Sequence, residues 1–419
     1  MNLILAIPME IRLAGLFVAG LCLGSAVNLA VYRLAWHARS ISPWTAPLPD
    51  APPRRAADRA PLLGWLGLRR EAGLHGGGFW IRPMLVELCC GIGLAWLYWW
   101  EVDQMALLPV PVPQAVAVLV MPVLHTQFAC HAVLLTIMLA GSLIDVDERI
   151  IPDTITVPGT LIGLAAVAAW PWVLLPHWIK VMPGVVEVEF VHLTSPHAWP
   201  SALGGFPLWR PLVLGLACWW LWCFALMPRT WYARHGRLRA VGLCLARLRR
   251  ERATWVIAAL GAVGSLGITT VWCGGQERWI GLLSSLVGMA ASGGLIWLVR
   301  VIGTAVLRRE AMGFGDVTLM AMIGALLGWQ ACLMVFFLAP FAGLVIGVSG
   351  LILRRGSEIP YGPFLCLAAV VVLVRWQALW NWGVGVFQLG WIVPGAVLVC
   401  LVLMAGLLGL WRLLLAAFH

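Results

Sequence analysis

Apolar residues run in long stretches along most of the chain, and polar residues gather in the segments between them. Apolar runs of about 18 or more residues are typical of helices that cross a membrane. The pattern predicts about eleven spans, and therefore an all-α, polytopic helical bundle in a membrane. The predicted spans cover residues 13–35, 83–100, 128–145, 154–174, 211–228, 254–273, 279–307, 317–333, 335–353, 364–382 and 391–415.

The composition supports a membrane protein and excludes several other classes. Of 419 residues, 62% are hydrophobic and 11% are charged, whereas soluble domains average about 45–50% and about 25%. Secreted enzymes, cytosolic enzymes and disordered regulators are therefore excluded. The net charge is +10, and Lys180 is the one lysine among 28 basic residues. This excess of arginine is typical of cytoplasmic loops, so we expect contact with membrane lipids and no nucleic-acid partner.

Four basic clusters orient the predicted spans. They are the loops 37–82 and 229–253 and the pairs Arg308-Arg309 and Arg354-Arg355. When the spans alternate in direction, all four clusters fall on one side, which the positive-inside rule assigns to the cytoplasm. Segments 101–127 and 175–210 then face outward.

Two acidic motifs lie at the edges of apolar spans, where carboxylates are costly and need a reason. The first is Gly141–Asp153, with the sequence GSLIDVDERIIPD, and the second is Gly313-Phe314-Gly315-Asp316. Asp145 ends one span and Asp316 opens another on the same side, so both lie at one depth. Two carboxyl groups brought together can share a proton, activate a water and protonate a leaving amine. Asp145 and Asp316 are therefore the candidate catalytic pair.

Neighbouring residues support this pair, although each also has a purely structural explanation. Gly313 and Gly315 let the backbone leave the helix and let a substrate approach Asp316, or they serve tight helix packing. Pro152 and Asp153 fit a helix start, where Asp stabilises open N–H groups. Asp147 remains an alternative to Asp145 as the first catalytic residue.

The ordered set of motifs resembles the GxGD aspartic proteases, and more closely the bacterial type IV prepilin peptidases. Asp145, Pro152-Asp153 and the later G-x-G-D carry this likeness. Further segments similar to the family, spread over about three-quarters of the chain, are Gly24–Leu34, Pro61–Trp65, Arg82–Leu88, Ile323–Trp329 and Ile359–Phe364.

The resemblance implies a protease of the bacterial inner membrane with its active site at the cytoplasmic side. It would remove the short basic leader of prepilins or pseudopilins, using Asp145 and Asp316, and then methylate the new N-terminus with S-adenosylmethionine. Residues 1–100 would form the methyltransferase-like region and 128–415 the peptidase core. Residues 175–278 would be an insertion of unknown role in that core.

The first loop departs from the family pattern. Many members bind zinc there through two C-x-x-C pairs, but residues 37–82 hold no cysteine. His75 alone cannot form a tetrahedral site. We therefore predict no zinc or other metal site and no cofactor for proteolysis, and methylation is less secure than cleavage.

Three other functions stay open. A different GxGD intramembrane protease shares the second motif, but such enzymes resemble this chain less in their first and last motifs. A transporter could bind protons or cations with the same acids, and it would show paired broken helices near the middle of the membrane. A family member without catalysis could act as an assembly scaffold.

Overall fold

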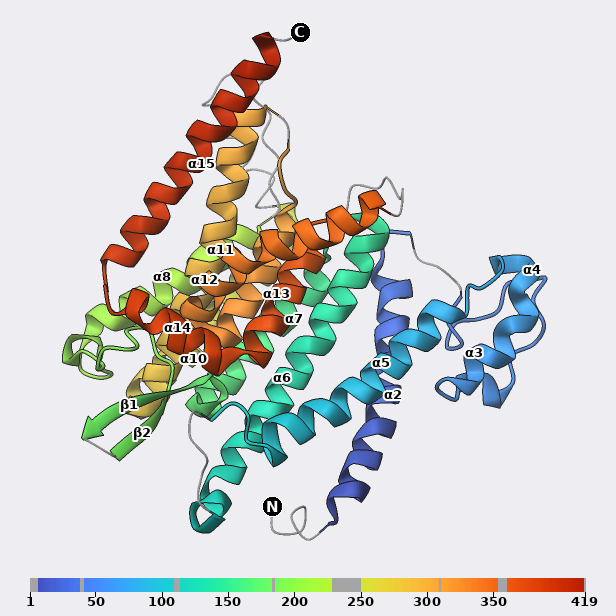
Figure 1. Cartoon of the computed structure of the whole chain (residues 1–419), viewed down its shortest axis with the longest axis horizontal. Coiled ribbons are helices and arrows are strands. Elements are labelled where there is room, and N and C mark those ends of the chain that lie inside the picture. The colour runs from blue at the N-terminus through green and yellow to red at the C-terminus, as the bar shows by residue number, and fades with distance from the viewer. Residues whose placement is uncertain are drawn as a thin grey trace.

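A computed structural model shows a bundle of long helices with one small hairpin (Figure 1). It describes residues 7–37, 41–108, 114–182, 185–227, 250–308, 310–352 and 360–417. The long helices are α2 (Met9–Leu34), α5 (Ile81–Tyr98), α6 (Gln114–Glu148), α7 (Asp153–Ala169), α8 (Trp209–Leu226), α10 (Arg252–Gly274), α11 (Gln276–Leu307), α12 (Phe314–Ile352), α13 (Gly362–Val374), α14 (Trp376–Phe387) and α15 (Ile392–Ala417).

The expected all-α membrane bundle is confirmed, but the count of eleven spans is not. Eight described helices are long and apolar enough to cross a membrane, or nine if α13 and α14, bent by 94°, form one span. The predicted span 154–174 is the 17-residue helix α7, which is shorter than a typical span. The predicted spans 317–333 and 335–353 belong to one helical run, α12, which is kinked at Gly328 (φ 81°, ψ 166°).

A two-stranded hairpin interrupts the helical pattern between α7 and α8. Strands β1 (Pro176–Met182) and β2 (Val185–Phe190) pair antiparallel, with His177 opposite Glu189. The hairpin lies in the predicted outward segment 175–210. Its short strands were hidden by the surrounding apolar residues, because a short apolar run does not distinguish a strand from a buried helix.

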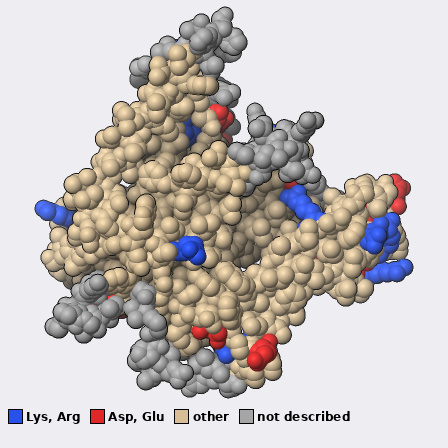
Figure 2. Space-filling model, in the orientation of Figure 1, with Lys and Arg blue, Asp and Glu red and all other residues tan. Residues whose placement is uncertain are grey.

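The core is built around α12, the most deeply buried of the long helices. α12 packs against α11, α13 and α7, and their facing side chains form the main hydrophobic cluster. α10 and α15 expose most of their apolar surface, as lipid-facing helices do. On the face in Figure 2, charged side chains are sparse over the helical body.

Small residues bring α2 and α5 into close contact. A Cβ added at Gly24 would lie 2.5 Å from the Cα of Glu87, and Asn28 Nδ2 donates a hydrogen bond of 2.9 Å to the Pro83 carbonyl. The buried Glu87 accepts hydrogen bonds from the Leu62 N–H (2.6 Å) and Trp65 Nε1 (2.8 Å). Three of the sequence segments that resemble the family thus meet here.

The segment between α2 and α5 is folded despite its many prolines and glycines. It contains α3 (Leu63–Leu68) and α4 (Ala72–His75), and Trp65 and Leu68 are fully buried. Two ion pairs, Arg54–Glu71 and Arg70–Asp58, join its turns. Asp58 also accepts a hydrogen bond of 2.7 Å from the Arg55 N–H.

The two ends of the long segment between α7 and α11 meet. Trp172 Nε1 donates a hydrogen bond of 2.9 Å to Glu277, and Pro171 packs against Gly281, where a Cβ would lie 2.7 Å from the proline Cβ. Of the predicted basic clusters, residues 229–249, Arg309 and Arg354-Arg355 lie outside the described residues.

The Asp58–Arg70 pair predicts a pH-dependent loop. The Arg70 hydrogen bond holds the pKa of Asp58 below its usual range. A lowered pKa means that the pair stabilises the loop above about pH 4 and that this stability is lost as the pH falls through the folded pKa. We expect Asp58→Asn to destabilise the loop at pH 7 by about 1.5–3 kcal/mol, with a smaller difference from wild type near pH 3.

Amide hydrogen exchange across residues 54–75 at both pH values measures this effect. Asp50→Asn is the matched control, since Asp50 is an exposed acid in the same segment. Equal protection in wild type and Asp58→Asn at pH 7 would contradict the prediction.

Candidate active site

Asp145 lies in the last turn of α6, where the sequence ends the helix. Arg149 adopts a left-handed conformation (φ 58°), and its N–H donates to the Asp145 carbonyl at 2.8 Å. Pro152 cannot continue a helix and favours an extended residue before it, so the chain turns and α7 begins at Asp153. Asp145 is thereby held at the rim of the bundle, with 4% of its surface exposed.

Asp316 lies in the first turn of α12 and reaches the same place. Its side chain is 7% exposed, and it lines the same cleft as Asp145. The adjacent Gly315 permits this approach, because a Cβ there would lie 2.8 Å from the Cβ of Ile151 and 2.9 Å from its carbonyl oxygen. Gly315 therefore packs against the turn after Asp145.

The segment before α13 closes the site from a third direction. The backbone N–H of Gly362 faces the Asp145 carboxyl, and a Cβ at Gly362 would lie 2.5 Å from Asp145 Oδ2 and 2.7 Å from Ile151 Cδ1. Ile151 thus touches both glycines. A larger residue at either glycine would separate the segments that hold the two aspartates.

Both aspartates line one cleft of about 980 Å³. Its walls are formed by the end of α2, the turn between α6 and α7, the segment that leads into α12 with its first turn, and the residues just before α13. The lining residues are Leu34, Trp36, Ile144, Asp145, Glu148, Arg149, Ile150, Ile151, Pro152, Asp153, Glu310, Ala311, Met312, Gly313, Phe314, Gly315, Asp316, Pro360 and Tyr361.

The charge of the cleft is strongly negative. In the part of the chain that the structure describes, its lining includes five carboxyl groups and one basic side chain, that of Arg149. Glu148 accepts the backbone N–H groups of Trp36 and His37, which ties the end of α2 to the end of α6. Glu310 pairs with Arg300 at 2.7 Å. Such a surface attracts a positively charged ligand.

The structure separates the candidate residues of the first motif. Asp147, the alternative to Asp145, does not line the cleft and pairs with Arg82 at 2.6 Å. Pro152 and Asp153 do line it, and Asp153 lies beside Thr318 of α12. Pro152 is the N-cap residue of α7 and Asp153 lies in its first turn, as expected for a helix start. Gly313 lies at the cleft, 3.9 Å from Asp316 Oδ2 when a Cβ is added.

Several residues in or beside the cleft were given no role in the sequence-based prediction. Tyr361 and Gly362 belong to a segment that resembled the family, so that signal was present. Burial raises the pKa of Tyr361 to about 12, so its hydroxyl stays protonated and can donate a hydrogen bond in the cleft. The contacts of Ile151 with Gly315 and Gly362 could not be predicted from the sequence, because nothing in the residues around Ile151 indicates which segments it meets.

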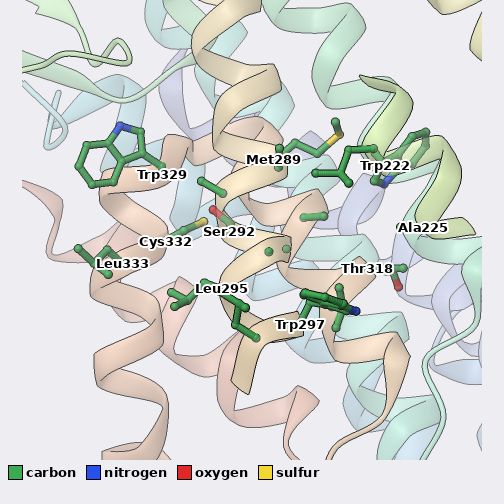
Figure 3. A pocket seen from close by; sticks show the side chains of 18 of the residues that line it. Trp222, Ala225, Met289, Ser292, Leu295, Trp297, Thr318, Trp329, Cys332 and Leu333 are labelled. Carbon is green, nitrogen blue, oxygen red and sulfur yellow. The ribbon is translucent and has the colours of Figure 1, made fainter. Parts of the chain in front are cut away.

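An apolar pocket of about 640 Å³ lies next to the cleft, between α8, α11, α12 and α15 (Figure 3). Trp222, Met289, Trp297, Cys332 and Leu333 are among its walls. Phe314 lines both the pocket and the cleft, so the two cavities adjoin at the start of α12.

Part of the chain matches a known family. Residues 240–348 match the model of the type IV leader peptidase family. The resemblance stated above is confirmed. This match contains the G-x-G-D motif with Asp316 but not Asp145, and it begins inside the predicted insertion 175–278.

Curated relatives of the type IV leader peptidase family cover a limited part of the chain. Proteins named prepilin leader peptidase/N-methyltransferase are 28% identical over 144 residues in Aeromonas salmonicida (31% of this chain, 50% of theirs) and 36% identical over 110 residues in Pseudomonas aeruginosa (23% and 38%). The chain spans about half the length of the curated relatives it matches, or less. No solved structure matches it.

The breaks in the helices do not favour the transporter. α12 is kinked at Gly328, and the α13–α14 pair bends near Arg375. Neither residue lines the cleft that contains Asp145 and Asp316. The acids lie at helix ends, and not at these breaks.

The packing of the two glycines predicts unequal effects of substitution. Gly315→Ala forces Ile151 to move, and overpacking of this kind costs about 1–3 kcal/mol of stability. Gly313→Ala meets no atom closer than 3.9 Å and should be tolerated. We expect a lower midpoint of thermal unfolding in detergent for Gly315→Ala alone, and equal midpoints for the two variants would refute the packing argument.

Proposed function

We propose that this protein is a membrane-embedded aspartic endopeptidase that removes the basic leader of prepilin- or pseudopilin-like precursors. One observation carries the proposal: two aspartates from segments far apart in the sequence line a single cleft at the ends of apolar helices. Membership of Asp316 in the matched family segment supports it. The site would act at the cytoplasmic side of a bacterial inner membrane.

In the proposed reaction, Asp145 and Asp316 share one proton and hold a water between them. The ionised carboxylate takes a proton from the water as it attacks the scissile carbonyl, and the other carboxyl protonates the leaving amine. The proton belongs to the pair and not to one residue. Tyr361 offers a hydroxyl donor in the same cleft for the oxyanion that forms.

The charge of the cleft supports a basic leader as the substrate segment. Glu148, Asp153 and Glu310 surround the catalytic pair. A short basic peptide would be drawn into this cleft from the aqueous side. Among the described residues, Arg149 is the one basic side chain that lines the cleft.

The adjoining apolar pocket supports a precursor whose leader is followed by a hydrophobic helix. Phe314 separates the two cavities. The scissile bond would therefore lie between a charged segment in the cleft and an apolar segment in the pocket. A peptidase that cleaves soluble substrates does not require an apolar pocket beside its cleft.

N-methylation with S-adenosylmethionine stays a separate proposal. The buried Glu87 of the N-terminal region already holds Leu62 and Trp65 in place, which describes a structural anchor. Mass analysis of the cleaved N-terminus distinguishes loss of the leader alone from loss with an added methyl group.

The catalytic pair is tested by matched substitutions. We expect Asp145→Asn and Asp316→Asn each to lower precursor cleavage by about 10²–10⁴-fold, because each removes one partner in proton transfer. The precursor is co-expressed or reconstituted with the full chain, and its N-terminus is measured by mass spectrometry.

Asp147→Asn is the control, because Asp147 pairs with Arg82 outside the cleft. Its cleavage rate should remain close to that of wild type. Retained cleavage in either Asp145→Asn or Asp316→Asn would reject the pair, and loss in Asp147→Asn alone would move the first catalytic role to that residue.

The apolar pocket is tested by filling it. Gly294 lines the pocket, and an added Cβ meets nothing within 4 Å, so Gly294→Phe should fold while occupying the space. Burial of one apolar side chain is worth about 1.5–3 kcal/mol, so we expect a roughly tenfold or larger rise in KM for a membrane-anchored precursor.

A soluble peptide that contains the leader and lacks the apolar helix should be affected much less. Gly267→Phe on α10 is the matched control, since its Cβ also meets nothing within 4 Å and it lies outside the pocket. If Gly294→Phe cleaves the anchored precursor like wild type, the pocket does not hold the substrate helix.

A further inference from the structure

A second cluster of reactive side chains lies in the hairpin region, outside the cleft. His177, Glu189 and His192 place one potential ligand atom each within 4.8 Å of one another. The hairpin lies at the lower left of Figure 1, whereas α6 ends, near Asp145, in the upper part. This cluster is therefore separate from the proposed active site.

The backbone arranges these three residues. His177 and Glu189 are direct partners across the antiparallel strands, so their side chains share one face of the hairpin. His192 follows shortly after β2, and its Nε2 lies 3.9 Å from Glu189 Oε2. Hydrogen bonds from Trp376 Nε1 to the Pro176 carbonyl and from Gln330 Nε2 to the His192 carbonyl, both 2.7 Å, fix the segment on α14 and α12.

Both histidines have an outer partner that leaves one ring nitrogen available. Ser195 Oγ lies 3.1 Å from His177 Nε2, and Thr194 Oγ1 lies 3.2 Å from His192 Nδ1. Metal-binding histidines usually donate their second N–H to such a partner, which fixes the tautomer. His177 Nδ1 is buried, and the ring also lies near the backbone of Trp178.

Burial and charge at the cluster also suit a cation. His177 and His192 are 1% and 5% exposed. Glu189 is half-exposed and supplies a carboxylate on the side open to solvent.

We propose that His177, Glu189 and His192 bind one divalent transition-metal cation, with Zn²⁺ the best match and water in the fourth position. Two histidines and one glutamate are an established zinc ligand set. Ligands of tetrahedral zinc lie about 3.4 Å apart at the usual bond lengths, so binding would draw these ligand atoms, now within 4.8 Å of one another, closer together. No metal site was predicted from the sequence, so this proposal departs from that prediction.

The bound cation would fasten the hairpin to the helices beneath it. His177 contacts the Trp380 ring of α14 at 5.4 Å between centroids, and His192 contacts that of Trp199 at 5.5 Å. Joining β1, β2 and the following turn through one metal would hold these contacts together. This role does not depend on the proposed peptidase activity.

The test measures zinc in the purified full chain, prepared in detergent without a polyhistidine tag. The protein is treated with a chelator, reloaded with Zn²⁺, desalted and analysed for bound metal. We expect close to one zinc per chain in wild type, and at least about tenfold weaker binding in Glu189→Gln and His192→Gln. Cobalt-loaded wild type should show visible absorption of a tetrahedral site, which Glu189→Gln abolishes.

His197→Gln and Glu187→Gln are matched controls, because they remove a nearby imidazole and a nearby carboxylate outside the cluster. Both should retain wild-type zinc content. Absence of bound zinc in wild type, or equal zinc in wild type and both ligand variants, would overturn the proposal. If His192→Gln fails to fold, Glu189→Gln decides, since its side chain is half-exposed.

Discussion

The active-site geometry depends on the close approach of three chain segments around Ile151. The turn after Asp145, the start of α12 and the segment before α13 meet where Gly315 and Gly362 leave no room for a Cβ. Dense packing of this kind has few alternative arrangements, because protein interiors hold little free volume. Two aspartates from distant parts of the chain can therefore line one cleft.

This packing also sets where charge and apolar surface meet. The acids lie at the ends of helices, where backbone and water can solvate them, and the apolar pocket begins one residue away at Phe314. Carboxylates deeper in the bundle would be far more costly. A boundary between a charged cleft and an apolar pocket therefore arises directly from the position of the helix ends.

The fold class and the two catalytic candidates could be predicted from sequence because their signals are local. Long apolar runs predict membrane helices, and an aspartate at the end of such a run needs a reason to be there. The choice between Asp145 and Asp147 could not be made, since it depends on the direction of each side chain and on Arg82. The number of spans was overestimated for a similar reason. Packing determines that α12 continues through the kink at Gly328 and that α7 ends after 17 residues.

The hairpin and its histidines were missed for a related reason. His177 and Glu189 become neighbours only through strand register, which the sequence did not reveal. Likewise, substrate approach and tight packing were both open for Gly315, and in the structure it packs against Ile151. At the hairpin and at Gly315, the residue types can be read from the sequence. Which residue each one contacts depends on the fold.

The meeting of Trp172 with Glu277, and of Pro171 with Gly281, has an evolutionary consequence. The hundred or so residues between these points include the hairpin, α8 and α10, and they begin and end at a single junction. Lengthening or shortening such an excursion changes little at its base, because the entropic cost of a closed loop grows slowly with its length. New elements could therefore accumulate there while the residues around Ile151 kept their arrangement.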